Sequence, residues 1–288
     1  MESTTPAADK NPYRCSTLNI AHRGARSLAP ENTMAAARKA LEISADLWEL
    51  DVQLTAEGEF IVLHDNSLDR TSNAEDVFPK RRPWLVSDFT LEEIRQLDFG
   101  SWFNERDPFG QIAAGHVSEA QQQSFVGEPA PTLRQALEWT RDNDWRVNVE
   151  LKDLDGQPGE ETFVERVVTL IEELNMMDRV LISSFNHDYV RRAKTANPKI
   201  QAGALSSRFI DNVAGYIREL GADAYNPKHT AIPQAQIRWL RDQGIHVYIY
   251  TVNDAEKMIH LAEAGASGLF TDYPQRLSEV LEVCSNDR

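Results

Sequence analysis

Short apolar runs rich in β-forming residues alternate along the chain with amphipathic segments of helical spacing. The runs that predict buried strands are residues 18–21, 47–53, 146–151, 179–183, 201–205, 224–226, 246–251 and 268–271. A further run over residues 59–64 follows the turn Ala56-Glu57-Gly58 and predicts an extra strand beside the second. Regular alternation of strand and helix favours a parallel sheet, and eight such steps favour a closed (β/α)8 barrel, the TIM barrel.

The residues that follow the first strand bear on the choice between a closed barrel and an open sheet. No GxGxxG sequence follows the first strand, which weakens the alternative of an open, dinucleotide-binding sheet. The first helix is predicted over residues 30–41, with Pro30 near its start, where a missing N–H costs nothing. A single barrel domain over residues 17–288 is therefore expected.

Two regions depart from the alternation. Residues 1–16 are polar and predict a disordered leader. Between residues 66 and 130 the alternation stops, and this stretch is too long for a plain loop in a compact domain. We expect residues 66–130 to form an insertion after the second strand, over the mouth of the barrel.

The net charge and the lack of long apolar runs narrow the classes of partner and location. The formal net charge of −15 and the lack of a basic tract argue against a nucleic-acid partner and against general attraction to anionic membranes. No apolar run is long enough to span a membrane, and the N-terminus has no apolar signal core, so a cytoplasmic location is expected. The sequence leaves the oligomeric state open.

The two cysteines, Cys15 and Cys284, lie in no CxxC or Cys/His cluster, so a zinc site is not expected. Both positions are predicted at the bottom face of the barrel, where the two thiols could be neighbours. A reducing cytoplasm favours two separate thiols over a disulfide.

Three carboxylates are predicted at the ends of neighbouring strands. Glu49 and Asp51 are two residues apart, so their side chains share one face of the second strand. Glu150 ends the next barrel strand. Carboxylates without soft ligands favour a hard cation, Mg²⁺ or Ca²⁺. The alternative, a solvated strand face, fits less well because the neighbouring positions are apolar and barrel strands are covered on both faces.

Histidines and cations accompany these carboxylates. His22 and Arg23 follow the first strand, His64 ends the extra strand, and Lys152 stands two residues after Glu150. Two histidines, two cations and a metal site are a set that can cleave a phosphate ester. Each group also has a structural interpretation, such as an Arg23–Glu31 or a Glu150–Lys152 ion pair. Their convergence at strand ends, where barrel enzymes place catalytic groups, favours catalysis.

The motifs HRG, PENT, ELDVQLT, HD, VELK, YTVND and GLFTDYP occur in this order, and together they resemble the glycerophosphodiester phosphodiesterases. The resemblance extends from about residue 19 to residue 274 and includes SDFTLEEIRQLDFGSWF within the insertion. It implies a (β/α)8 barrel that uses a divalent cation to hydrolyse a small glycerophosphodiester to sn-glycerol 3-phosphate and an alcohol.

The resemblance also implies roles for individual residues. The implied catalytic pair is His22 and His64, the implied metal ligands are Glu49, Asp51 and Glu150, and the implied phosphate contacts are Arg23 and Lys152. Phe185 stands where the family often lines its pocket. Tyr250 stands where many members have Trp, and Ser44 where many have Gly; the first departure bears on the shape of the pocket and on the preferred alcohol.

Two other functions are compatible with these residues. Related barrels with paired histidines act as phospholipases on lysophospholipids or inositol lipids, but they would need an apolar mouth, which the polar insertion does not favour. A catalytically silent barrel that binds a phosphorylated ligand or a protein would be expected to lack a histidine or a metal carboxylate. None is missing here.

Overall fold

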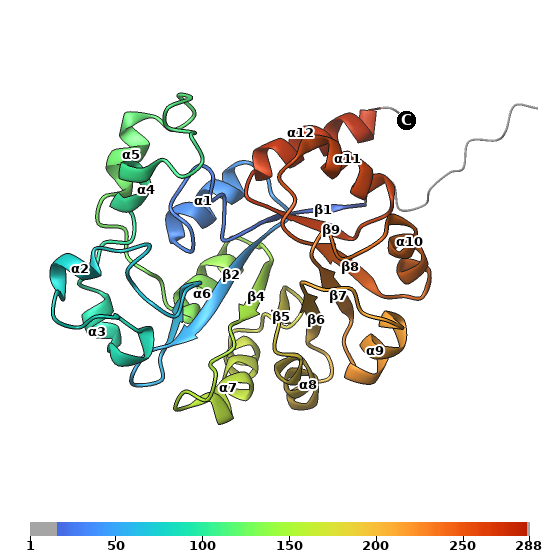
Figure 1. The fold of residues 1–288 in the computed structure, drawn as a ribbon, viewed down its shortest axis with the longest axis horizontal. Coiled ribbons are helices and arrows are strands. Elements are labelled where there is room, and N and C mark those ends of the chain that lie inside the picture. The colour runs from blue at the N-terminus through green and yellow to red at the C-terminus, as the bar shows by residue number, and fades with distance from the viewer. Residues whose placement is uncertain (1–15, 287–288) are drawn as a thin grey trace, which may run out of the picture.

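Eight parallel strands close into a barrel in the computed structural model, which describes residues 16–286 (Figure 1). Around the barrel the order is β1, β9, β8, β7, β6, β5, β4 and β2, and β2 pairs with β1 to complete the ring. The strands are β1 (Leu18–Ala21), β2 (Leu47–Leu54), β4 (Val147–Leu151), β5 (Val180–Ser184), β6 (Gln201–Ser206), β7 (Ala224–Pro227), β8 (His246–Ile249) and β9 (Gly268–Thr271). The predicted (β/α)8 barrel is confirmed.

Helices between successive strands cover the outside of the barrel (Figure 1). They pack apolar faces against the strands, whose side chains are almost entirely buried. No helix in the described part of the chain is both long and apolar enough to cross a bilayer. The helices are α1 (Met34–Glu42), α6 (Leu133–Asp142), α7 (Glu160–Glu173), α8 (His187–Ala196), α9 (Val213–Leu220), α10 (Gln234–Asp242), α11 (Ala255–Glu263) and α12 (Pro274–Asn286).

The first helix begins later than predicted. We expected it from Pro30, but α1 starts at Met34. Asn32 has a φ of +57°, and Thr33 is extended and caps the helix by accepting a hydrogen bond from the Ala36 N–H. A side chain that caps the N-terminus marks the start of a helix. The residues before it therefore form a loop at the barrel mouth.

The extra strand β3 (Phe60–Val62) runs antiparallel to β2, as predicted. Val52 pairs with Val62 and Leu54 with Phe60, so the end of β2 and β3 form a hairpin. The returning chain brings His64 back to the level of Asp51, whose carbonyl accepts a hydrogen bond from the Leu63 N–H. His64 therefore enters the site from a hairpin, whereas the other site residues lie on or directly after barrel strands.

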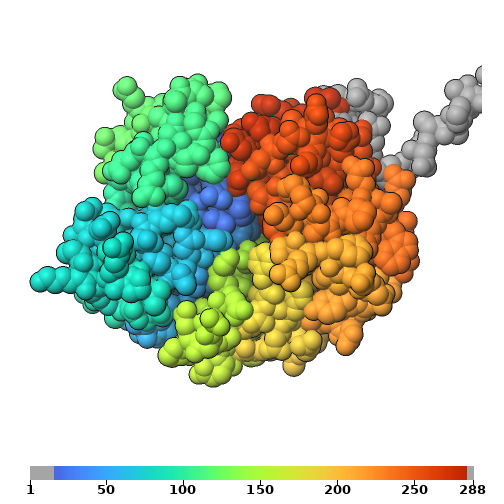
Figure 2. All heavy atoms as spheres, viewed as in Figure 1, coloured from blue at the N-terminus to red at the C-terminus, as the bar shows by residue number. Residues whose placement is uncertain are grey.

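The insertion forms a lobe beside the barrel, cyan to green in Figure 2. One of its two apolar clusters is shared with the loop after β1, where Leu28 and Ala29 pack against Trp102 and Phe103. Its position over the barrel mouth stays a prediction. The short helices of the lobe are α2 (Ala74–Val77), the 3₁₀ helix η1 (Val86–Asp88), α3 (Leu91–Ile94), α4 (Ser101–Arg106) and α5 (Glu119–Phe125).

Two predictions concern parts of the chain outside this description. The leader of residues 1–16 lies outside the described residues except for its last position. Cys15 and the side chain of Cys284 also lie outside them, so the question of their pairing stays open.

Candidate functional site

A cavity of about 200 Å³ opens at the carboxyl ends of the barrel strands. Among the described residues, those that line it come from the barrel strands, their following loops and the β2–β3 hairpin, and none comes from residues 66–130. Eight of the nine site residues predicted from the sequence are among them. Asp51, the ninth, lies beside them beneath the surface of the cavity. The lining residues are His22, Arg23, Glu49, His64, Glu150, Lys152, Ser183, Phe185, Leu205, Tyr250, Thr251 and Phe270.

The three predicted metal carboxylates lie together. Asp51 and Glu150 are register partners on β2 and β4, and Glu49 stands two residues before Asp51 on the same face. One oxygen from each carboxylate lies within 4.8 Å of the others. Glu49 Oε1 and Asp51 Oδ1 are buried and accept no hydrogen bond. Buried oxygens without donors are costly unless a cation satisfies them, so these residues fit a hard divalent ion.

The electrostatics of this cluster are those of crowded negative charge. Burial raises the pKa of Glu49, and the charges of Asp51 and Glu150 raise it further. Burial and Asp51 also raise the pKa of Glu150. Burial opposes ionisation of Asp51 too, but Lys152 and Arg23 hold its pKa well below the usual range. A bound cation would relieve the repulsion that raises the pKa of Glu49 and Glu150.

Arg23 and Lys152 bring positive charge to the same cavity. Arg23 has a φ of +56°, and its backbone N–H donates to Glu49 at 2.7 Å. Its guanidinium donates to Glu31 at 2.9 Å and lies 3.3 Å from Asp51. Lys152 Nζ lies 2.7 Å from Glu150 and 3.5 Å from Asp51. The structural ion pairs are therefore present, and both side chains still line the cavity.

Each histidine is hydrogen-bonded to a carboxylate through Nδ1. His22 Nδ1 lies 2.7 Å from Asp272, and His64 Nδ1 lies 2.6 Å from Asp65. Asp272 also accepts a hydrogen bond from Asn253 at 2.7 Å. Burial, followed by the charge of Arg23, lowers the pKa of His22, although Asp272 acts in the opposite direction. With Nδ1 bound to a carboxylate, the Nε2 of each ring is left for proton transfer.

Sequence reasoning had not singled out these partners. Asp272 follows β9, which pairs with β1 so that Thr271 stands beside Ala21 and places Asp272 next to His22. Asp65 stands in the HD motif. Asn32, in the PENT motif, was also missed: its side chain donates to Asp51 at 2.8 Å. The quoted motifs contained all three residues, but spacing alone did not reveal their contacts.

Glu31 braces the loop after β1 and is not part of the carboxylate cluster. Its side chain is 2 % exposed and accepts hydrogen bonds from the guanidinium groups of Arg23, Arg26 and Arg70. Burial opposes its ionisation, but these arginines lower the pKa of Glu31 to about 2. Glu31 is therefore ionised at neutral pH, where its carboxylate is surrounded by three guanidinium groups.

Two aromatic side chains form an apolar part of the cavity wall. The rings of Phe185 and Tyr250 meet edge to face, with centroids 5.7 Å apart. Phe185 remains 46 % exposed, whereas the Tyr250 hydroxyl is buried and forms no hydrogen bond. This wall can contact the uncharged parts of a ligand whose charged group lies near the carboxylates and cations.

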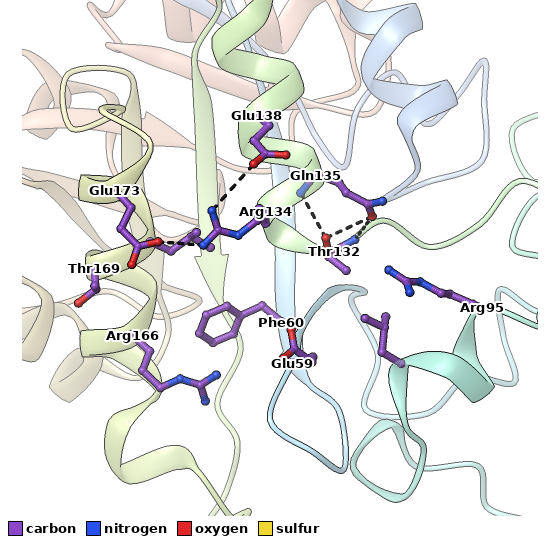
Figure 3. Close-up of a pocket in the computed structure, with 12 residues that line it drawn as sticks. Glu59, Phe60, Arg95, Thr132, Arg134, Gln135, Glu138, Arg166, Thr169 and Glu173 are labelled. Carbon is purple, nitrogen blue, oxygen red and sulfur yellow. Dashed lines mark hydrogen bonds and ion pairs between the residues drawn. The ribbon is translucent and has the colours of Figure 1, made fainter.

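A larger cavity of about 630 Å³ lies on the outer flank, between α6, α7 and β3 (Figure 3). Three of its charged side chains pair with one another: Arg134 contacts Glu138 and Glu173. It contains no histidine and none of the carboxylate cluster. The candidate catalytic residues therefore line the smaller cavity at the barrel mouth, not this one.

Comparison with known proteins agrees with this geometry. Residues 22–276 match the Glycerophosphoryl diester phosphodiesterase family. A glycerophosphodiester phosphodiesterase from Caldanaerobacter subterraneus subsp. tengcongensis is 36 % identical over 91 % of this chain and 96 % of its own.

Two solved structures share the fold and part of the sequence. A phosphodiesterase from Oleispira antarctica, in complex with the product sn-glycerol 3-phosphate, superposes with a TM-score of 0.73 and 26 % identity, covering 91 % of this chain and 96 % of the other. A glycerophosphodiester phosphodiesterase from Agrobacterium tumefaciens gives 0.70 and 26 %, covering 91 % and 99 %. The chain belongs to the glycerophosphoryl diester phosphodiesterase family.

Proposed function

We propose that the chain hydrolyses small glycerophosphodiesters to sn-glycerol 3-phosphate and an alcohol, with a divalent cation, Mg²⁺ or Ca²⁺, and a pair of histidines. The observation that carries this proposal is the meeting of two histidines, two cations and three carboxylates around one cavity. The product named in the Oleispira antarctica complex supports the choice of substrate class.

Glu49, Asp51 and Glu150 would hold the cation, because their oxygens converge and one oxygen each of Glu49 and Asp51 accepts no hydrogen bond. When bound, the cation supplies Lewis-acid stabilisation of the charge that builds up on the phosphoryl oxygens. Arg23 and Lys152 line the same cavity and donate to those oxygens. The side chains of Arg23 and Lys152 are already held by neighbouring carboxylates, so they reorganise little when the substrate binds.

The histidines carry out the proton transfers. The lowered pKa of His22 keeps its ring neutral at pH 7, the form that accepts a proton from the attacking hydroxyl. His64 is 31 % exposed and donates a proton to the departing alkoxide as the phosphorus–oxygen bond breaks. The attacking hydroxyl belongs to water or to the substrate's own glycerol. Each transfer contributes about 10² to 10⁴ in rate, so electrostatic stabilisation must supply the rest.

The wall of Phe185 and Tyr250 would contact the uncharged part of the substrate. It supports binding of a diester with one organic arm against the rings and the phosphate against the cations. The cytoplasmic location stays a prediction.

Assay of glycerophosphocholine and glycerophosphoethanolamine with Mg²⁺ or Ca²⁺ tests the proposal. We expect release of sn-glycerol 3-phosphate, loss of release on adding a chelator, and recovery when the cation is restored. No release from several headgroups under either cation would contradict it. Faster hydrolysis of the matching lysophospholipid would favour the phospholipase alternative, and ligand-dependent melting without turnover would favour the silent barrel.

A further inference from the structure

One network of ion pairs connects the two histidines through the buried carboxylate of Glu31. On one side, Arg26 pairs with Glu31 and lies 3.4 Å from Asp272, the partner of His22. On the other side, Arg70 contacts Glu31 at 2.6 Å. Charges alternate along the whole network, so each group stabilises its neighbours in their ionised form.

Arg70 is the link that reaches His64. Its Nε donates to Asp65 Oδ2, while the other oxygen of Asp65 lies 2.6 Å from His64 Nδ1. One guanidinium therefore bridges Asp65, which follows the β2–β3 hairpin, and Glu31, which follows β1. The planar fork of an arginine holds two carboxylates in a fixed geometry that an ammonium group cannot reproduce.

The insertion supplies this arginine and fixes its backbone. Arg106, in α4, donates to the carbonyl of Arg70 at 2.8 Å. The flanking Leu68 and Thr71 are buried, Leu68 within an apolar cluster of the insertion. Arg70 lines no part of the catalytic cavity, but it is held in contact with Asp65, which in turn contacts His64.

Asp65 depends on this contact more than Asp272 depends on Arg26. Asp272 also accepts a hydrogen bond from the Asn253 side chain, and its backbone N–H donates to the same side chain, so several contacts orient it. Among residues 16–286, the recorded partners of the Asp65 carboxylate are His64 and Arg70. Without Arg70, Asp65 would be free to turn toward solvent, and the ring of His64 would lose its fixed orientation.

We propose that Arg70 is a positioning residue, through which the insertion orients His64 by way of Asp65. This inference rests on the proposed function, because it assigns His64 a proton-transfer role. Holding Nδ1 as a donor to Asp65 keeps Nε2 directed at the substrate, in the same way that a carboxylate orients the histidine of a Ser-His-Asp triad. Arg70 itself touches neither the substrate cavity nor the metal carboxylates.

The test compares Arg70→Met with Arg81→Met in the full chain. Arg81 is a matched control: it lies in the same insertion, is 35 % exposed against 36 % for Arg70, and pairs with Glu93 away from the cavity. We expect Arg70→Met to lower kcat at least about tenfold, with KM and Mg²⁺ affinity within about twofold of the parent chain. Arg81→Met should leave all three unchanged.

A double-mutant cycle tests the route through Asp65. If Arg70 acts on Asp65, then Arg70→Met, Asp65→Asn and the double variant should lower kcat to a similar extent, without adding. Nitrogen-15 shifts of the His64 ring, assigned with His64→Ala, should show loss of the single Nδ1–H tautomer in each variant. Arg70→Lys should recover little of the activity, because it cannot bridge both carboxylates.

Several results would overturn the inference. In Arg70→Met, these results are an unchanged kcat or a rise in KM alone. In the double-mutant cycle, the contradicting result is an additive effect of the two substitutions. A fall in kcat would also count against the inference if it is explained by lost metal affinity or if Arg81→Met shows the same fall. If Arg70→Met does not fold, Asp65→Asn and the His64 ring spectrum of Arg70→Lys still decide the matter. An active parent chain with an equally active Arg70→Met contradicts this inference alone, whereas an inactive parent chain contradicts the proposed function.

Discussion

The His22 and His64 halves of the site use the same contact, an imidazole Nδ1 held by a carboxylate, in different surroundings. His22 is 15 % exposed, and its partner Asp272 directly follows the neighbouring barrel strand β9. His64 is 31 % exposed, and its partner Asp65 is held by an arginine of the insertion. The barrel builds one half by itself, whereas the other half depends on the added lobe. The two halves should therefore respond differently to mutation.

Removing either histidine should have the largest effect. We expect His22→Ala and His64→Ala each to lower kcat by about 10² to 10⁴, with Mg²⁺ affinity retained. A diester with a p-nitrophenolate leaving group needs little protonation, so it should recover much of the lost rate in His64→Ala but not in His22→Ala. Steady-state kinetics with both substrates check this, with exposed His116→Ala as control. Equal recovery in both variants would contradict the assignment of base and acid.

Asp272→Asn should have the next largest effect. Asparagine has nearly the same shape but favours the wrong tautomer of His22, and the equivalent change in a Ser-His-Asp enzyme costs up to about 10⁴ in kcat. We expect kcat to fall by about 10² to 10³, which is more than in Asp65→Asn. The reason is that less water reaches the buried His22–Asp272 pair to replace the lost hydrogen bond. Measurement of kcat for both variants decides; a larger loss for Asp65→Asn would reverse the comparison of the two halves.

The metal carboxylates are shared by both halves, and their raised pKa values predict a pH dependence. Glu49 and Glu150 keep protons at higher pH than ordinary glutamates, so a cation must displace those protons. Mg²⁺ affinity should fall as the pH is lowered, from a higher pH than ordinary glutamates would cause, with protons released on binding. Calorimetric titration in buffers of different ionisation enthalpy, repeated at several pH values, measures both quantities. An affinity that does not change with pH would remove Glu49 and Glu150 from the ligand set.

Phe185→Ala should have the smallest effect. The Phe185 ring takes part neither in proton transfer nor in cation binding. We therefore expect KM to rise a fewfold, which corresponds to a loss of about 1 kcal/mol of binding free energy, and kcat to stay nearly unchanged. Phe209→Ala is a suitable control, since Phe209 is exposed but does not line the cavity. A fall in kcat for Phe185→Ala comparable to that of the histidine variants would show that the aromatic wall positions the reacting groups.

The barrel strands and the site residues on them can be predicted from the sequence, whereas the partners that orient the histidines cannot. The eight strands were recognisable because barrel strands are covered on both faces and therefore appear as short apolar runs. The site residues were recognisable because Glu49, Asp51 and Glu150 interrupt those runs with charge, which has a cost that chemistry must justify.

Long-range pairing explains what was missed. Asp272 lies 250 residues from His22 along the chain, and only closure of the barrel brings the two together. Arg70 lies in a polar segment without periodicity, where an arginine carries no sign of its partner. The start of α1 was wrong because Thr33 caps the helix in preference to a start at Pro30. Such contacts are decided by tertiary structure, beyond the reach of local patterns.

The β2–β3 hairpin has a consequence for how this enzyme could be redesigned. β2 and β4 are neighbours in the barrel, yet the chain leaves the sheet between them and returns only after the whole lobe. Closing a longer loop costs little, about 0.6 kcal/mol for each doubling of its length. Recombination at this junction could therefore exchange one lobe for another without disturbing the register of the barrel. A transplanted lobe would need to bring a bidentate cation to the carboxylate that follows the hairpin.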